Sequence, residues 1–395
     1  MLQHQTQPVA VAANPVPIQA ARPRMISIDV FRGVTVAFMI LVNTAGDGSV
    51  SYAQLQHSMW NGCTLTDLVF PTFLFLMGVS MAISLSPSAR TPAPASARLA
   101  KATRRSLILI LIGLFLNMLP FFQLGTLRYC GVMQRIGITY WLAAVALLLL
   151  DWSGIAVLGA LILLGYWALM TLITVPGFGK TGMELGVLDP VGNLASALDR
   201  IVISPAHIYR HTFFDPEGLL STLPALCSVL LGGLAWWFLQ NQKLKSRLAS
   251  MAGCGAVFAA LGLVWSIVFP INKRLWTSSY VLWAAGIDFL VLALLSWYLD
   301  KTKDSASRQL RGWLTPWLAF GSNALAAYVL SEVLASVIGA VRMTSGITLQ
   351  RWTYLLIPDW AGSPPLRSLE WSLAFTAACY IPIHLLYRKR ILIKL

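Results

Sequence analysis

The segment from residue 154 to residue 175, GIAVLGALILLGYWALMTLITV, contains no charged side chain. A helix of ~20 apolar residues crosses the hydrocarbon core of a bilayer, so this run is long enough to span a membrane. Similar runs recur along most of the chain, in which 57% of the residues are hydrophobic and only 11% are charged. Soluble domains carry about 25% charged residues. The sequence therefore predicts an all-α, polytopic transmembrane helical bundle.

Ten stretches are apolar and long enough to be spans, and they predict a single transmembrane domain over residues 26–395. They are 26–45, 66–86, 104–120, 129–150, 154–175, 218–240, 249–269, 279–299, 314–338 and 367–388. The segment 339–366 is broken by Gly, Arg and Pro and is expected to be a loop with interfacial pieces. Residues 1–25 are rich in Ala, Pro and Gln, and we expect them to form a disordered cytoplasmic tail.

The formal net charge is +14, which in a soluble protein would suggest a nucleic-acid partner. In a membrane protein the positive-inside rule explains it, because Lys and Arg concentrate in cytoplasmic loops. Ten spans place both termini on one side, and the short loops on that side hold most of the clustered cations. The rule therefore predicts cytoplasmic N- and C-termini, the lipid bilayer as partner, and no nucleic acid.

The five cysteines show no disulfide or metal-ligand spacing, so we interpret them as small apolar packing residues and predict no metal site. The sequence also lacks the P-loop, the dinucleotide-binding glycine motif and the nucleophile elbow of soluble enzymes. Any chemistry must therefore come from scattered polar residues that face the inside of the bundle.

Polar residues within spans are costly and are functional candidates for that reason. Asp29 and Arg32 lie three apart on one face of the first span, either as a simple ion pair or as part of a site. Arg135, two turns into the fourth span, needs an anionic partner. Further polar residues in the spans are Asp288, Asn323 and Glu332.

His57 precedes the second span, at the start of which lies Asp67. Histidine exchanges protons near neutral pH, and a buried carboxylate could hold its ring in one tautomer. The alternative is an interfacial histidine that caps a helix. Nearby aromatic residues on the same side, such as Trp60, Trp276 and Trp352, suit the membrane interface or could stack on sugar rings.

Six separated motifs carry a family resemblance. They are 26-ISIDVFRGVTVAFMILVN-43, 57-HSMWNGCTLTDLVFPTFLFLMG-78, 131-GVMQRIGITY-140, 215-DPEGLLSTLPA-225, 270-PINKRLWTSSYVL-282 and 321-GSNALAAYV-329. In this order they resemble the transmembrane acyltransferases of the heparan-alpha-glucosaminide N-acetyltransferase family, bacterial members included.

The resemblance implies transfer of an acetyl group from cytosolic acetyl-CoA to the amine of a glucosamine-type acceptor across the membrane. It matches the catalytic histidine of the family to His57 and a catalytic asparagine to Asn43. We expect Asp67 to orient His57 and Asn43 to stabilise the oxyanion. The route is either direct transfer or an acetylated His57. The CoA thioester would enter from the cytoplasmic face, with Arg32, Asp29, Arg135, Arg104 and Arg105 as candidate contacts.

Where the lysosomal relative carries a luminal domain before its first conserved span, this chain has only a short tail. We therefore expect an amino sugar of the periplasm or envelope as acceptor, rather than heparan sulfate. The location expected is the bacterial inner membrane, and the resemblance also suggests a homodimer. Two other functions stay open: an amino-sugar or N-acetylglucosamine transporter, although the halves show no repeat, and a structural membrane protein.

Overall fold

The computed structural model describes residues 25–85, 94–176, 188–241, 244–300, 307–358 and 362–393. Within these ranges the chain is helical, with two isolated backbone bridges outside the helices. The α-helices are α1 (Ile26–Asn43), α2 (Leu65–Leu85), α3 (Ala95–Met118), α4 (Val132–Leu149), α5 (Trp152–Leu172), α6 (Leu194–Val202), α7 (Thr222–Asn241), α8 (Leu244–Trp265), α9 (Ser278–Leu299), α10 (Ser307–Ser322), α11 (Ala324–Ala340), α12 (Leu349–Leu355) and α13 (Pro364–Arg388). The predicted all-α fold is confirmed, whereas the tail predicted over residues 1–25 lies outside the described residues except for Met25.

Eight helices of the described ranges are long and apolar enough to cross a membrane, against ten predicted spans. One difference is α3, whose first half carries Lys101, Arg104 and Arg105, so that only its second half is uniformly apolar. The second difference lies in the predicted span 314–338. It is divided between α10 and α11, which meet at an angle of 78°.

The break between α10 and α11 falls at Asn323, which has a non-helical backbone conformation. Its side chain stabilises the break, because the Asn323 amide donates to the Ile391 carbonyl (3.1 Å) and accepts from the Ile393 N–H (2.9 Å). The segment after α13 is thereby held against the helix junction. A hydropathy pattern does not reveal such a bend, because the apolar residues continue across it.

Glycines let α2 and α7 approach until their backbones touch. A Cβ on Gly78 of α2 would lie 1.9 Å from the Val229 carbonyl of α7, and one on Gly232 would lie 1.9 Å from the Phe75 carbonyl. Close approach at small residues is the usual way in which helices associate in lipid, where apolar surface alone gives no drive to pack. The pair α2–α7 is therefore held by direct backbone contact at the centre of the bundle.

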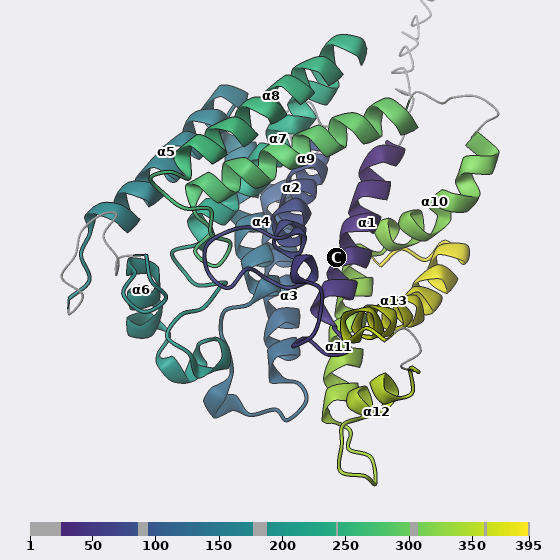
Figure 1. Cartoon of the computed structure of the whole chain (residues 1–395). Helices are drawn as coiled ribbons and strands as arrows, with labels where there is room; N and C mark the ends of the chain where they lie inside the picture. The colour runs from purple at the N-terminus through teal and green to yellow at the C-terminus, as the bar shows by residue number, and fades with distance from the viewer. Residues whose placement is uncertain are drawn as a thin grey trace, which may run out of the picture.

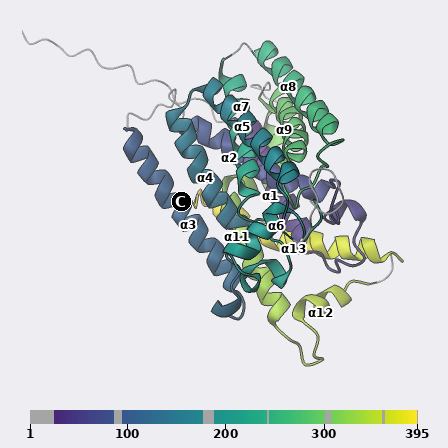
Figure 2. The ribbon, with the colours of Figure 1, turned by 90° about the vertical axis from the view of Figure 1, so that its left-hand side faces the viewer.

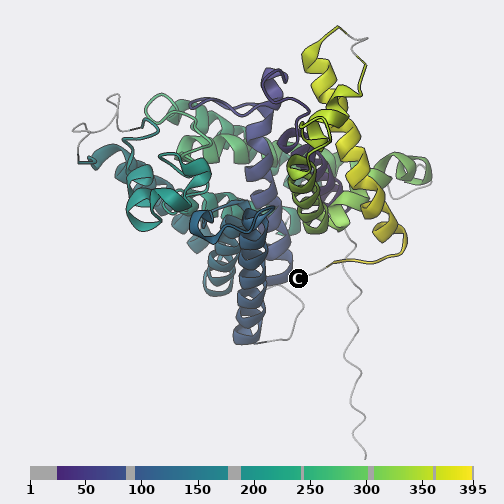
Figure 3. The ribbon, with the colours of Figure 1, turned by 90° about the horizontal axis from the view of Figure 1, so that it is seen from below.

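The helices form two groups on either side of α1. Helices α2 to α9 lie on one side of it, and α10 to α13 lie on the other (Figure 1). Figure 2 shows α3 beside α4 and α8 beside α9, two pairs that are in extensive contact. Seen from below, the yellow C-terminal helices again lie apart from the teal helices, with the purple α1 between them (Figure 3). Helix α1 thus joins the two groups, since it contacts both α2 and α10.

Burial distinguishes the inner helices from the outer ones. In α2 and α7 about two thirds or more of the span is buried (67% and 72%), whereas in α5 and α8 only 28% and 17% are buried. The exposed side chains of α5 and α8 are apolar, which suits contact with lipid. Residues 339–366, predicted to be a loop, contain the end of α11, the short α12 and the start of α13.

Candidate functional site

The imidazole of His57 is bound to the carboxylate of Asp67. The loop of residues 44–64 brings His57 back over the first turn of α2, where its Nδ1 lies 2.7 Å from Asp67 Oδ1. The side chain of Asp67 is 1% exposed, and that of His57 is 43% exposed. The structure therefore places an accessible imidazole on a buried carboxylate.

The Asp67 carboxylate is fully occupied by donors. Its second oxygen, Oδ2, accepts from the Ser58 N–H (3.1 Å), the Thr64 N–H (3.0 Å) and the Thr64 hydroxyl (3.1 Å). These bonds and the N-terminus of α2 favour the ionised form of the carboxylate. Because an ionised carboxylate only accepts, the proton between the two residues belongs to His57 Nδ1. The Nε2 atom of His57 then has a free lone pair, as a general base requires.

The site is held by the start of α9 and by the segment that precedes this helix. The Tyr280 hydroxyl donates to the backbone carbonyl of Asp67 at 2.6 Å. The Gly62 N–H donates to the Ile271 carbonyl at 2.7 Å, and the Asn272 amide donates to Asn61 Oδ1 at 3.1 Å. Gly62 itself adopts a positive φ of 108°, which glycine tolerates without strain. The loop that carries His57 and the segment before α9 therefore form one unit.

Asn43 is the last residue of α1 and faces α11. Its side chain and that of Tyr328 lie close to the carboxylate of Glu332. Tyr328 is buried, while Asn43 is exposed. The sequence predicted Asn43 and Glu332 separately as polar residues of spans, and the structure brings them together.

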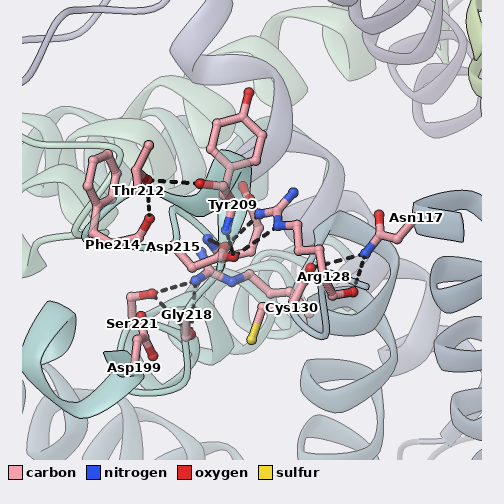
Figure 4. Close-up of polar contacts among 12 residues, drawn as sticks. Asn117, Arg128, Cys130, Asp199, Tyr209, Thr212, Phe214, Asp215, Gly218 and Ser221 are labelled. Atoms are coloured by element: carbon pink, nitrogen blue, oxygen red, sulfur yellow. Dashed lines mark hydrogen bonds and ion pairs between the residues drawn. The ribbon is translucent and has the colours of Figure 1, made fainter. Parts of the chain in front are cut away.

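A buried ionic cluster lies beside the starts of α4 and α7 (Figure 4). Arg128 binds Asp215 through two hydrogen bonds of 2.9 and 2.5 Å and also binds Glu217 at 2.5 Å. The ring of Tyr209 covers the guanidinium with a centroid distance of 4.6 Å. The two carboxylates raise the pKa of Arg128, and Arg128 is the main cause that lowers the pKa of Glu217 to about 2 despite burial. These charges compensate one another, as buried ions must.

Arg135 lies next to this cluster and is 1% exposed. Its Nη2 donates to the Ser221 hydroxyl at 2.5 Å and to the Gly218 carbonyl at 3.3 Å. The Trp276 ring stacks on its guanidinium at 5.0 Å. Among the described residues none accepts a hydrogen bond from its Nε or Nη1. Trp276 is itself fully buried, so the expectation that it stacks on a sugar or lies at the interface is wrong.

Lys273 is the member of the cluster that follows, in the chain, a residue bound to the His57 loop. Its side chain is 11% exposed, and its Nζ lies 3.9 Å from Glu217 Oε1. Burial lowers the pKa of Lys273, and the negative charges of Glu217 and Asp67 partly offset that effect. Lys273 directly follows Asn272, the residue that binds Asn61 of the His57 loop. The ammonium group of Lys273 thus belongs to the ionic cluster through Glu217.

Asp199 of α6 forms the outer edge of the cluster. Its Oδ1 accepts from the Leu219 N–H at 2.9 Å, and a Cβ on Gly218 would lie 1.9 Å from its Oδ2. Burial, with a contribution from the charge of Asp215, raises the pKa of Asp199 to about 6. This carboxylate therefore changes charge close to neutral pH, unlike Glu217.

The candidate residues near the other end of the bundle have structural partners. Arg32 donates to Asp29 (3.4 Å), to the Ser80 hydroxyl near the end of α2 (2.6 Å) and to the Gly321 carbonyl at the end of α10 (3.3 Å). Arg104 and Arg105 are exposed on α3, and Arg105 stacks on Tyr140 at 5.0 Å. Arg32 therefore connects α1, α2 and α10. Arg135 lies at the His57 end of the bundle, away from Arg32.

The cysteines closest to the site are weak nucleophiles. Burial raises the pKa of Cys63 to about 12, and that of Cys130 to about 12. Both stay protonated at neutral pH, which agrees with the prediction that they serve packing. Among the described residues, no three His, Cys, Asp or Glu side chains are arranged to hold a metal ion.

Sequence reasoning missed the ionic cluster. Its members come from three loops, and no spacing rule relates Arg128 to residues 87 and 89 positions later. Two motifs quoted above, 215–225 and 270–282, contain the other members, yet their charges were not assigned to a site. The one available signal was the presence of Asp215, Glu217 and Lys273 beside apolar runs.

The fold and these contacts define a class: a polytopic helical membrane protein with a histidine–aspartate pair and a compensated ionic cluster at one end of its bundle. Residues 24–185 match the family described as heparan-alpha-glucosaminide N-acetyltransferase, catalytic. The chain is similar to this family over that segment, which is its N-terminal part.

Two known proteins are similar to this chain over most of its length. Heparan-alpha-glucosaminide N-acetyltransferase of Homo sapiens is 30% identical, over 80% of this chain and 54% of the relative. The protein of the same name from Mus musculus is 30% identical, over 83% of this chain and 56% of the relative. The chain thus spans about half the length of these relatives.

Proposed function

We propose that this protein is a membrane-embedded acyltransferase that moves an acetyl group from acetyl-CoA to the amine of a glucosamine-type sugar. The observation that carries the proposal is the His57–Asp67 contact of 2.7 Å, with an exposed imidazole on a buried carboxylate. An imidazole with a free Nε2 is suited to remove a proton from an attacking amine. The similarity of the chain to heparan-alpha-glucosaminide N-acetyltransferases supports this reaction.

In the direct route, the neutral amine attacks the thioester carbonyl and forms the C–N bond. His57 Nε2 accepts the amine proton, and Asp67 stabilises the resulting imidazolium through Nδ1. The Asn43 amide donates a hydrogen bond to the oxyanion. The C–S bond then breaks, and the CoA thiolate leaves and takes up the proton. In the alternative route, Nε2 itself carries the acetyl group between two such steps.

For the donor we propose acetyl-CoA entering from the cytoplasm. The exposed Arg104 and Arg105 are suited to contact its phosphates, and Arg32 and Asp29 lie along the path at α1. Arg135 lies at the His57 end of the bundle, and its Nε and Nη1 are oriented without an acceptor among the described residues. We therefore assign Arg135 to the acyl end of the donor rather than to the nucleotide.

The acceptor side is proposed to be the periplasm of a bacterium, with the protein in the inner membrane. The basic loops at the ends of α2, α7 and α9 favour the cytoplasm by the positive-inside rule. The loops that precede α2, α4, α7 and α9 then face the periplasm together with His57. An amino sugar of the envelope could reach the imidazole from that side.

The test uses liposomes that contain labelled acetyl-CoA and carry the purified protein, with glucosamine supplied outside. We expect labelled N-acetylglucosamine outside for the wild type and none for His57→Ala. Labelled product that forms only with acetyl-CoA on the same side as the sugar would contradict the sidedness. Uptake of intact sugar without acetyl transfer would contradict the enzyme and support the transporter.

A further inference from the structure

A narrow apolar groove runs along the outside of the bundle between α5 and α8. Its floor is formed by buried side chains of α7, on which both helices pack, and its volume is about 320 Å³. Residues that line it include Gly159 and Leu163 of α5, Leu230 of α7, and Phe258 and Trp265 of α8. Both α5 and α8 lie on the side of the bundle away from α10 to α13 (Figure 1).

A glycine in the wall keeps the groove open. A Cβ on Gly159 would have no atom within 4 Å, so the space beside this part of α5 is not filled by protein. The backbone of Gly159 is nevertheless close to the floor, because the Cys227 thiol of α7 donates to the Gly159 carbonyl at 3.6 Å. The groove is therefore a gap between side chains of helices that are themselves in contact.

The lining offers little to bind water. Its side chains are apolar except for the thiol of Cys227 and the indole of Trp265. The thiol already donates to the carbonyls of Gly159 and Leu223. An ordered water in a protein needs two to four polar partners. The occupant that suits this groove is therefore apolar.

The surroundings and dimensions of the groove select a hydrocarbon chain. Only 28% of α5 and 17% of α8 are buried, so both walls face the lipid. From Ile155 to Leu164 the groove follows α5 for about 14 Å, close to half of the ~30 Å hydrocarbon thickness. Spread over this length, 320 Å³ corresponds to a cross-section of about 24 Å². A helix with side chains covers roughly 80 Å² or more and does not fit.

We propose that this groove binds one acyl chain of a bilayer phospholipid and holds it apart from the exchanging lipid around the protein. The inference does not depend on the proposed acyl transfer. At one end of the groove Trp265 meets Trp167 edge to face, with ring centroids 6.2 Å apart. Tryptophan side chains collect at the headgroup level of a bilayer, so the glycerol end of the lipid lies there.

This end of the groove is the one nearer to the His57 loop. Helix α8 ends at Trp265, and the segment that follows it accepts the Gly62 N–H at the Ile271 carbonyl. The bound phospholipid therefore belongs to the leaflet on the side of His57.

The first test is native mass spectrometry of the full-length protein, released from nanodiscs that contain phosphatidylethanolamine as their lipid. We expect the wild type to keep one phospholipid under conditions that strip away the others. Gly159→Phe fills the groove and should lower the lipid-bound fraction by about tenfold, because displacing even two buried CH₂ groups has an effect of that size.

Gly165→Phe is the matched control on the same helix. A Cβ at Gly165 also meets no atom within 4 Å, but Gly165 does not line the groove. The two variants add the same side chain to the lipid-facing surface of α5, and only Gly159→Phe should lose the lipid. Equal loss in both variants would overturn the proposal, because it would indicate general contact with lipid.

A second measurement uses the wild type alone. Phosphatidylethanolamine with a photoreactive diazirine in its acyl chain is crosslinked to the protein in nanodiscs, and the adducts are mapped. We expect adducts on Leu230, which is 2% exposed at the floor of the groove and out of reach of surrounding lipid. Adducts confined to the outward side chains of α5 and α8 would overturn the proposal. So would a lipid-free dimer that disappears in Gly159→Phe, since the groove would then bind a second copy of the chain.

Discussion

The Nδ1 atom of His57 and the Oδ1 atom of Asp67 are 2.7 Å apart, although the two residues lie ten positions apart in a loop and a helix. The loop returns to the helix start because Asp67 Oδ2 collects the backbone N–H groups of Ser58 and Thr64. The same carboxylate thus fixes both the loop conformation and the histidine tautomer.

The substitution Asp67→Asn should lower kcat by about 10²- to 10⁴-fold. An asparagine can present an N–H to His57 Nδ1, which would leave the proton on Nε2 and remove the free lone pair. The measurement is the rate of acetyl transfer at saturating acetyl-CoA. Asp47→Asn, on the surface of the same loop, is the matched control and should retain the wild-type rate. Equal activity of Asp67→Asn and wild type would show that the tautomer plays no part.

Replacing Asn43 by Ala should lower kcat by about 10²- to 10³-fold, the usual cost of losing one oxyanion donor. The KM for acetyl-CoA should change little, because the bond forms only as the oxyanion develops. Tyr328→Phe is the control, since it removes a hydroxyl close to Glu332 but leaves the Asn43 amide in place. If both variants lose activity equally, the Asn43–Glu332 contact matters for structure rather than for catalysis.

The pKa of Asp199 predicts that the stability of the folded protein depends on pH. Burial raises its pKa to about 6 from the ordinary 3.8, so the folded state holds this proton more tightly than the unfolded state. The stabilising contribution is complete below pH ~4 and is lost as the pH rises through ~6. Asp199→Asn should therefore stabilise the protein at pH 7, by up to about 3 kcal/mol, and should flatten the profile.

Thermal unfolding in detergent at pH 5 and pH 7 provides the measurement for Asp199→Asn. Asp47→Asn serves as the comparison of opposite sign, because hydrogen bonds from Ser49 lower the pKa of Asp47. An Asp199→Asn variant that loses stability at pH 7 would contradict the assigned cost of burying this charge.

Gly78→Ala should destabilise the bundle by about 1 to 3 kcal/mol, as overpacking of a close contact does. Its new methyl group would meet the Val229 carbonyl at 1.9 Å, and backbone cannot move aside as a flexible side chain can. Gly159→Ala is the matched control, because no atom lies within 4 Å of its added Cβ. The midpoint of unfolding in detergent should fall for Gly78→Ala and not for Gly159→Ala.

Much of the fold follows from the sequence, because an uninterrupted apolar run in a membrane has few alternative structures to a spanning helix. The predicted run 66–86 corresponds to α2 and the run 279–299 to α9, each within one residue at either end. The bend at Asn323 was not predicted, because it depends on hydrogen bonds to Ile391 and Ile393, about 70 residues away. Apolar patterns report local composition and carry no information on such distant contacts.

The candidate site was predictable where its residues are close in sequence or match a motif. His57, Asp67 and Asn43 were each expected, and the contact between the first two was inferred from the character of a buried carboxylate. The contact of Arg128 with Asp215 and Glu217 was not inferred, because it depends on how three loops converge at the starts of helices. Arg135 was expected to need an anion, whereas its contacts are Ser221, Gly218 and the Trp276 ring.

The Tyr280 hydroxyl of α9 donates to the Asp67 carbonyl of α2, and the Asp67 side chain binds His57. The position of the imidazole is therefore tied to α2 and α9. Asn43 instead ends α1, and its side chain lies close to Glu332 of α11. The two proposed catalytic groups thus contact different helices, so a small shear between α1 and α2 would change their separation. Such a sliding motion would bring the imidazole and the amide to the same reaction centre only when both substrates are bound.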